Sequence, residues 1–397
     1  MQEICFVSNV LLPSFNIPKD GITYIGVEFP RTMLDLKPSI IVGKNSHLDE
    51  YDRNFLSKFR AYKIIPLTRN RLIDTYNAFF KLRESMVELG SIDIVHLINI
   101  NPLIFSMLSK QYKETWRIKF IDTLLARYFG KPNTKDYITL YLKLLTHLRM
   151  FAGVATTSPL IFNILRRTLG EKAFFTPPPI DTDFYKPFNV TIGDTLISNI
   201  IDSKADFVAL FIGDLNPYRF PVREVFKAIK RLENMGMNVL MVIVSRYSHY
   251  YDYVNSIAKK EGVQKKAKII IKSLRPDEKI YLYNISDIVI FPFKGFTAVD
   301  PPIALLEAMS CGRIVLATAI ESIPIIIKDN INGFLLDRVE PEILVEKIRT
   351  ALMHKDAQDI TRNARLTIVK HFSRQNTKKA LQLVYEKVMD NWSTSKN

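Results

Sequence analysis

Residues 281–333 carry the pattern that most constrains the fold of this chain: strand, polar loop, helix and strand in direct succession. The run at 288–291 is short and apolar and is closed by Pro292, which is typical of a buried parallel strand. The next strand follows at 314–317. Strands and helices also alternate through the first half of the chain, and this order predicts parallel sheets covered on both faces.

The helix inside this stretch has clear start and stop signals. Asp300 stands where an N-cap belongs, and Pro301 and Pro302 suit the first turn because their φ angles are already fixed. The helix then continues until Gly312 ends it. Its free backbone N–H groups would point at the carboxyl end of the preceding strand, which is a favourable place for a phosphate.

An acid within the apolar part of this helix sharpens the prediction. Glu307 follows Asp300 by seven residues, so the two carboxylates are expected on roughly the same helix face. A carboxylate there could accept both hydroxyl protons of a ribose, at about 1.5–3 kcal/mol for each charged hydrogen bond. The alternative is a helix cap and an acid paired with a local Lys or Arg.

Several segments resemble the GT-B glycosyltransferases, in particular the large retaining family 4 (glycosyl transferases group 1) and most of all its archaeal members. The segments LLEAMSCGRIVLA at 305–317 and NGFLL at 332–336 resemble the nucleotide-sugar half of that fold. FVALFIGDLNPYRFP at 207–221 is similar to the first strand and phosphate loop of the same half, PPPIDTDFYKP at 177–187 to the interdomain linker, and IDIVHLINI at 92–100 to a strand of the amino-terminal half.

The resemblance covers nearly the whole chain and implies an α/β protein with two Rossmann-like parallel-sheet domains facing across a cleft. A length of 397 residues fits two domains. We expect an acceptor-binding domain with the linker at 1–187, a nucleotide-sugar-binding domain at 188–374, and a helix at 375–397 that crosses back to the amino-terminal domain.

In the amino-terminal half, the resemblance implies that a loop bearing Gly21 lies near the donor phosphates and that Asp122, at the end of a strand, faces the reacting sugar. An ordinary strand-to-helix turn and a helix cap are the respective alternatives. His96 lies within a strand where the family often has a histidine, and a structural role competes there with a functional one.

In the second half, the resemblance assigns the diphosphate to Gly213 and Arg219, with a plain surface arginine as the alternative for the latter. Relatives usually place an arginine directly after this glycine, where the present chain has Asp214. The remaining residues assigned by resemblance to nucleotide-sugar binding are Lys272, Leu274, Thr297, Asp300 and Glu307.

The chain departs from the family at one important position. The usual acid lies eight residues before the equivalent of Glu307, and that position is Val299. Asp300 is one residue away and is expected to contact the donor sugar, so that Asp122 and Asp300 are the predicted catalytic residues. A degenerate, non-catalytic copy stays open.

No metal or other cofactor is expected beyond the nucleotide-diphosphate sugar, which is a co-substrate. Asp181 and Asp183 match a metal-binding pattern of another glycosyltransferase architecture, but by resemblance they lie in the domain linker. Cys5 and Cys311 have no metal-ligand spacing, which suits a reducing compartment.

The net charge of +15 favours polyanionic partners, but the basic residues are spread over both halves and no nucleic-acid motif is present. We therefore expect no nucleic-acid partner. Residues 127–153 predict a basic amphipathic helix that could dock on an anionic membrane, although a helix packed on its own sheet is the alternative. No apolar run is long enough to span a bilayer and no signal peptide is evident, so we expect a cytoplasmic protein with peripheral membrane contact on the inner face left open.

The resulting prediction is a retaining glycosyltransferase that moves a hexose from a nucleotide-diphosphate sugar to a hydroxyl of a lipid-linked or polymeric glycan. The alternatives are a GT-B nucleotide-sugar epimerase, a non-catalytic nucleotide-binding homologue and, on charge alone, a nucleic-acid binder.

Overall fold

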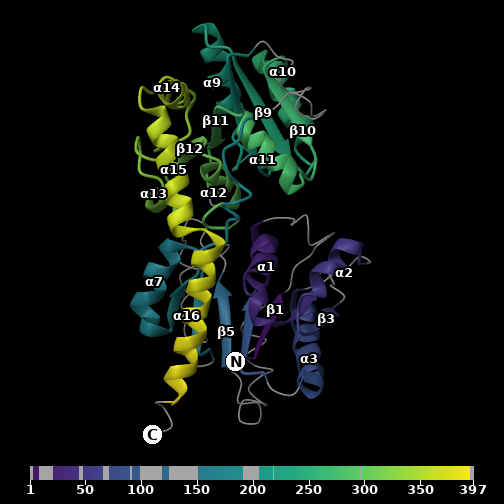
Figure 1. Ribbon diagram of the computed structural model, residues 1–397. Coiled ribbons are helices and arrows are strands. Elements are labelled where there is room, and N and C mark those ends of the chain that lie inside the picture. Colours follow the sequence, from purple (N-terminus) through teal and green to yellow (C-terminus); the bar gives the residue numbers. More distant parts are fainter. Residues whose placement is uncertain are drawn as a thin grey trace. The chain divides into compact units, whose positions relative to one another are not determined.

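The computed structural model describes residues 3–8, 21–43, 48–65, 71–89, 92–98, 119–124, 151–190, 205–217, 219–295, 297 and 299–393. The chain divides into two compact units (Figure 1). The first unit comprises Met1–Pro179, Ala298–Asp300 and Arg374–Asn397, and the second comprises Ile180–Thr297 and Pro301–Ser373. The sequence placed the boundaries at 187/188 and 374/375.

The first unit is built on a seven-stranded sheet in which all pairs are parallel. Every residue of the central strands is buried, so both faces of the sheet are covered, as the alternating pattern predicted. In spatial order the strands are β3 (Tyr62–Ile65), β2 (Ser39–Gly43), β1 (Ile4–Ser8), β4 (Ile94–Ile98), β5 (Lys119–Leu124), β6 (Gly153–Thr156) and β7 (Ala173–Phe175).

The last strand of this sheet was not predicted. β7 closes the sheet because it pairs with β6, through Val154 and Ala173. Within the described residues, the helices of the unit are α1 (Gly21–Thr32), α2 (Glu50–Leu56), α3 (Arg71–Leu89), α7 (Pro159–Leu169) and α16 (Arg374–Ser393), with short 3₁₀ turns at Leu34–Leu36 and Gly170–Lys172.

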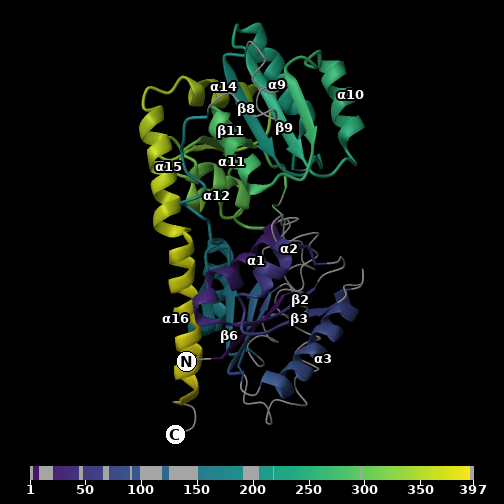
Figure 2. The ribbon, with the colours of Figure 1, turned by 45° about the vertical axis from the view of Figure 1, so that its right-hand side comes forward.

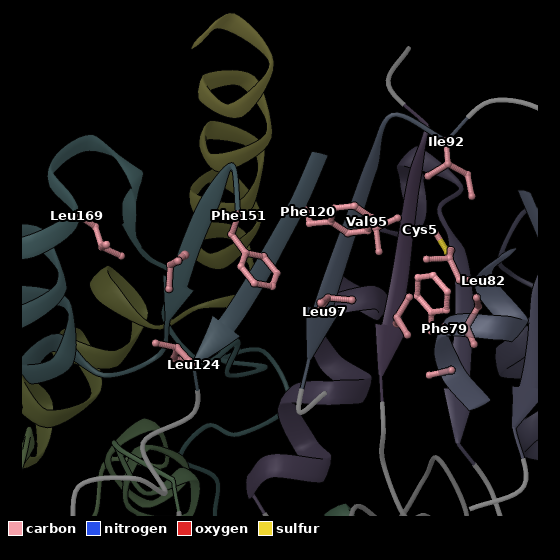
Figure 3. Close-up of a cluster of buried hydrophobic side chains, with 14 of the residues drawn as sticks. Cys5, Phe79, Leu82, Ile92, Val95, Leu97, Phe120, Leu124, Phe151 and Leu169 are labelled. Atoms are coloured by element: carbon pink, nitrogen blue, oxygen red, sulfur yellow. The ribbon is translucent and has the colours of Figure 1, made fainter. Parts of the chain in front are cut away.

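One hydrophobic cluster of the first unit joins the sheet to its helices (Figure 3). Cys5, Val95 and Phe120 contribute from neighbouring strands, and Phe79 and Leu82 contribute from α3. At about 25 cal/mol per Å² of buried apolar surface, such clusters supply most of the stabilisation of a unit of this size.

The carboxy-terminal helix α16 lies beside α1 and β6 (Figure 2). Thr377 Oγ1 donates a hydrogen bond to the Pro177 carbonyl at 2.9 Å, and Arg374 contacts the buried Glu28 carboxylate at 2.7 Å. Tyr385 reaches His96 in β4. The final helix is therefore part of the first unit's packing.

The second unit contains a six-stranded parallel sheet, and the strands β9, β11 and β12 are buried at every position. Its spatial order is β10 (Ala267–Ile271), β9 (Val239–Ser245), β8 (Phe207–Ile212), β11 (Ile288–Phe291), β12 (Ile314–Thr318) and β13 (Phe334–Leu336). Its helices are α9 (Val222–Asn234), α10 (Tyr251–Glu261), α11 (Pro276–Ile285), α12 (Ile303–Ser310), α13 (Ile323–Ile326), α14 (Pro341–Leu352) and α15 (Ala357–His371).

The direction of chain progression reverses between β8 and β11. From β8 the chain moves outward to β9 and β10, and it then returns to β11 on the other side and moves outward to β12 and β13. Ligands of open parallel sheets bind outside the carboxyl ends of the strands at such a reversal. The loops after β8 and β11 are therefore the expected position of a ligand-binding site.

Among the helices described here, none is long and apolar enough to cross a membrane. The amphipathic helix expected within residues 127–153 lies outside the described residues except for 151–153.

Candidate functional site

Glu307 lies in α12 with its side chain fully buried, and its carboxylate is paired with two side chains of α11. The Lys279 ammonium donates to its Oε1 at 2.8 Å and to its Oε2 at 3.0 Å. The Tyr283 hydroxyl donates to Oε2 at 2.9 Å. Lys279 and Tyr283 are four residues apart on α11, so they lie on one helix face and meet the carboxylate together.

Burial strengthens this small network. Tyr283 is fully buried, and burial together with the nearby Glu307 charge raises the pKa of its hydroxyl well above the usual value. Tyr283 therefore remains a hydrogen-bond donor at neutral pH. The Lys279 ammonium also lies 5.8 Å from the centre of the Tyr185 ring, within the range of a cation–π contact. The ion pair agrees with the alternative considered above, an acid paired with a local lysine, and the ribose contact stays a prediction.

Asp300 does not cap α12, so this part of the sequence-based prediction was wrong. The helix begins at Ile303 and its N-cap is Pro302, with no side-chain capping bond. Asp300 is instead buried within the first unit, where Ser158 Oγ donates a short hydrogen bond to its carboxylate and Thr157 Oγ1 donates to its carbonyl at 3.1 Å. Because it precedes the helix, Asp300 does not share a helical stripe with Glu307.

The loop after β8 is tightly folded around Gly213. A Cβ at this position would lie 2.7 Å from Cζ of the buried Phe211 ring, so a side chain would clash. Asp214 turns its Oδ1 toward the amide of Asn216 at 3.1 Å, which uses the carboxylate as a turn-forming acceptor. The amide of Arg219 donates to the Asn216 carbonyl at 2.8 Å and closes the turn.

The loop after β10 is fixed by another ion pair. Lys272 Nζ lies 2.6 Å from Glu278 Oε1, and the Arg275 amide donates to Glu278 Oε2 at 2.9 Å. Burial of Glu278 opposes its ionisation, but the hydrogen bonds from Lys272 and from the Arg275 amide outweigh it and lower the pKa. Leu274 between them is buried. The Lys272 ammonium and the Arg275 amide of this loop are therefore both anchored to Glu278.

The loop after β11 is tied to the loop after β12 by Thr297 and Glu321. The Thr297 amide donates to Glu321 Oε2 at 3.0 Å, and its hydroxyl donates a short hydrogen bond to the same oxygen. Glu321 holds a φ of 49°, in the left-handed region that favours glycine. Residues other than glycine rarely adopt this conformation, so the hydrogen bonds with Thr297 help to hold Glu321 in it.

In the first unit, Asp122 does not end its strand as predicted. It lies inside β5, opposite Leu97 of β4 and Val154 of β6, and the strand continues to Leu124. Its side chain is buried. Gly21 is the first residue of α1, and the loop before it lies outside the described residues, so its contact with the donor phosphates stays a prediction.

His96 has a structural environment. Its Nδ1 lies 2.9 Å from the Tyr385 hydroxyl and its Nε2 lies 2.5 Å from Thr123 Oγ1. Complete burial lowers its pKa to about 3. A neutral histidine with both ring nitrogens occupied holds β4, β5 and α16 together, which supports the structural alternative.

Among the described residues, no group of three or more His, Cys, Asp or Glu side chains could hold a metal ion. Asp181 Oδ1 instead accepts a hydrogen bond from the Phe184 amide at 3.0 Å. Cys5 and Cys311 are buried free thiols, and burial raises the pKa of each to about 12, which leaves neither as a ready nucleophile.

Sequence reasoning missed Lys279, Tyr283, Glu321 and Ser158. Lys279 and Tyr283 are four residues apart, and this spacing was a usable signal, since such residues share a face on a helix. Glu321 follows the strand at 314–318, at the same edge of the sheet as Gly213. An acid that follows a parallel strand lies at the edge where ligands bind, and this position was the usable signal for Glu321.

Part of the second unit matches a known protein family. Residues 196–367 match the family described as Glycosyl transferases group 1. A comparison with curated proteins returned no match.

The fold of the whole chain recurs among solved structures. A glycosyltransferase from Rickettsia africae ESF-5 is 18% identical with a TM-score of 0.77, and the match covers 98% of the present chain and 100% of that one. The sucrose-phosphate synthase from Thermosynechococcus elongatus is 13% identical with a TM-score of 0.75 over 98% and 100% of the two chains. Anabaena Alr3699/HepE, solved in complex with UDP and glucose, is 14% identical with a TM-score of 0.72 over 97% and 100%.

These matches agree with the two parallel-sheet units of the present chain. The fold expected from the resemblance is confirmed as GT-B. The chain has the GT-B fold. The match of residues 196–367 to Glycosyl transferases group 1 supports an enzyme that transfers glycosyl groups.

Proposed function

We propose that this protein is a retaining glycosyltransferase that moves a hexose from a nucleotide-diphosphate sugar to a hydroxyl of a lipid-linked or polymeric glycan. The Glycosyl transferases group 1 domain supports the transfer of a glycosyl group. A protein of the same fold, Anabaena Alr3699/HepE, has been solved with UDP-glucose, which supports a nucleotide-sugar donor here.

The observation that carries the proposal is the convergence of loops at the strand reversal of the second unit. Gly213 and Arg219 follow β8, and Thr297 follows β11, which is its neighbour in the sheet. The start of α12 comes after the same loop, so its free N–H groups are available for an anion. A diphosphate would be held here by the helix start, the Gly213 backbone and the Arg219 guanidinium.

The other ends of the donor follow from the strand order. β10 lies two strands from β8, and we assign the base to the backbone of the loop that contains Lys272 and Leu274, which is anchored to Glu278. Glu307 on α12 is assigned to the pentose. Asp300, Asp122 and the Gly21 loop are proposed to face the sugar and its phosphates, and the buried contact of Asp300 with Ser158 would orient that carboxylate.

The proposed reaction is a same-face displacement. The acceptor hydroxyl oxygen forms a bond to the anomeric carbon while the bond from that carbon to the diphosphate oxygen breaks. The hydroxyl proton passes to the departing phosphate oxygen, so no protein nucleophile is required. Arg219 and the α12 start would stabilise the charge that grows on the diphosphate, and one well-placed donor of this kind is worth about 3–4 kcal/mol.

The acceptor and the location are proposed from the charge of the chain. The net charge of +15 supports an anionic partner such as a lipid-linked glycan at a membrane surface. We propose that the protein is cytoplasmic and contacts the inner face of the membrane peripherally. The proposed reaction needs no metal ion and no nucleic acid.

Thermal-shift screening against UDP, GDP, ADP and their sugars tests the proposal. The preferred nucleotide should raise the melting temperature of the wild type and raise that of Arg219→Ala much less, since ligand binding to the folded state stabilises it. Transfer to a lipid-linked glycan with an unchanged anomeric configuration should follow.

Two outcomes would identify another function. Release of a free sugar product from the donor alone would indicate an epimerase. Nucleotide binding without turnover on any acceptor would indicate a non-catalytic homologue.

A further inference from the structure

The carboxylate assigned to the pentose is shielded in the structure. The Glu307 side chain has an exposed fraction of 0%, whereas the Lys279 side chain that is bound to it has an exposed fraction of 23%. The third member of the cluster, Tyr283, is also fully buried. Lys279 is therefore the side chain of this cluster that meets the solvent, and a ligand approaching Glu307 meets Lys279 first.

The hydrogen-bond capacity of Glu307 is nearly exhausted. A carboxylate has about four lone-pair positions, two on each oxygen. Oε1 accepts one bond from Lys279, and Oε2 accepts one bond from Lys279 and one from Tyr283. One position on Oε1 is left, but a pentose diol that donates both hydroxyl protons needs two.

Lys279 is the partner that can give way. Its ammonium sits on a flexible four-carbon stem and can rehydrate when it moves, because the side chain already reaches solvent. The Tyr283 ring is packed in the core and cannot leave without opening a cavity.

We propose that Lys279 and the donor pentose compete for Glu307. In the free protein the Lys279 ammonium occupies acceptor positions of the carboxylate, and nucleotide binding exchanges it for the two pentose hydroxyls. Lys279 is then a specificity-determining residue, because each hydroxyl bond gained is offset by an ammonium bond lost. This inference rests on the proposed function, in which Glu307 binds the pentose.

The exchange predicts weak discrimination between ribose and deoxyribose. We expect wild-type protein to bind UDP and 2′-deoxy-UDP with dissociation constants within about threefold of each other. In Lys279→Met the carboxylate has no competing cation, so loss of the 2′-hydroxyl should weaken binding by about tenfold or more, as for a charged hydrogen bond. Isothermal titration calorimetry gives the ratio of the two dissociation constants for each protein. GDP with 2′-deoxy-GDP and ADP with 2′-deoxy-ADP are measured in the same way.

Lys347→Met is the matched control. Lys347 also pairs with a carboxylate of the second unit, Asp329, at 2.9 Å, and its side chain has a similar exposed fraction of 25%. Its substitution should leave the ratio of the wild type unchanged. Lys279→Gln serves as a second variant in case Lys279→Met fails to fold, because its side-chain amide can still donate to Glu307. Its ratio of dissociation constants should fall between those of the wild type and Lys279→Met.

Two results would overturn the inference, and they differ in what else they remove. Equal ratios in wild type and in both Lys279 variants would show that Lys279 does not compete with the pentose, and the proposed function would stand. If no nucleoside diphosphate binds the wild type, the proposed function fails together with the inference.

Discussion

Tyr385 on α16 places its hydroxyl 2.9 Å from Nδ1 of His96 on β4, and this contact joins residues 289 positions apart in the chain. Both side chains are buried, so neither polar atom can turn to water if its partner is removed.

Removal of the tyrosine hydroxyl should destabilise the protein. We expect Tyr385→Phe to lower the free energy of unfolding by about 1–3 kcal/mol, because a buried ring nitrogen loses its partner. Chemical denaturation measures this change. Leu383→Ala on the same helix is the control, because Leu383 is 49% exposed and its loss should cost less than about 0.5 kcal/mol.

His96 should make stability depend on pH. Burial lowers its pKa from 6.5 to about 3 in the folded protein. Below pH 6.5 the unfolded chain therefore binds a proton that the folded chain does not, and stability falls with decreasing pH by up to about 1.4 kcal/mol per pH unit for this group. His96→Gln should remove this component from the pH profile of unfolding. A profile of the same slope in His96→Gln would contradict the assignment.

Gly213→Ala should disturb the β8 loop, because the new methyl group would lie 2.7 Å from Cζ of Phe211. Overpacking of this kind costs about 1–3 kcal/mol, and it should also weaken nucleotide binding. The double variant with Phe211→Leu should regain part of the lost stability, since a smaller side chain makes room for the methyl group. Absence of any rescue would mean that the clash is not the cause.

Arg365 on α15 should contribute more to stability than its neighbour Arg362. Its guanidinium donates to the carbonyls of Ser310, Tyr185 and Thr182 at 2.7, 3.1 and 3.2 Å. Arg365→Met should cost about 2–3 kcal/mol, since three carbonyls lose a charged donor. Arg362, with 69% exposure and a single contact to Asp359 among the described residues, is the matched control. Equal melting temperatures for the two variants would contradict this account.

The strands β11 and β12 and the helix between them could be predicted because each has a local signal. The end of β11 at Pro292 and the left-handed Gly312 after α12 are set by the residues themselves. The cap at Asp300 failed for a local reason as well. A residue before proline is pushed toward extended backbone, and Pro302 itself is extended with ψ of 125°, so two successive prolines delay the helix to Ile303.

The site depended on packing that no local pattern encodes. Lys279 on α11 meets Glu307 on α12 across 28 residues, and neither helix specifies that contact alone. Asp122 was expected at a strand end, but the pairing continues beyond it, with β4 to Thr123 and with β6 to Leu124. Strand length in a sheet is set by the adjacent strands as well as by the strand's own sequence.

The most direct test of the central claim is hydrogen–deuterium exchange of the full chain with and without UDP-glucose. Binding at the strand reversal of the second unit predicts slower exchange in the loop at 213–219, in residues 272–279 and in the start of α12, with the exposed face of α15 unchanged. Protection confined to other segments, or no protection at saturating UDP-, GDP- or ADP-sugar, would contradict a donor site at this edge of the sheet.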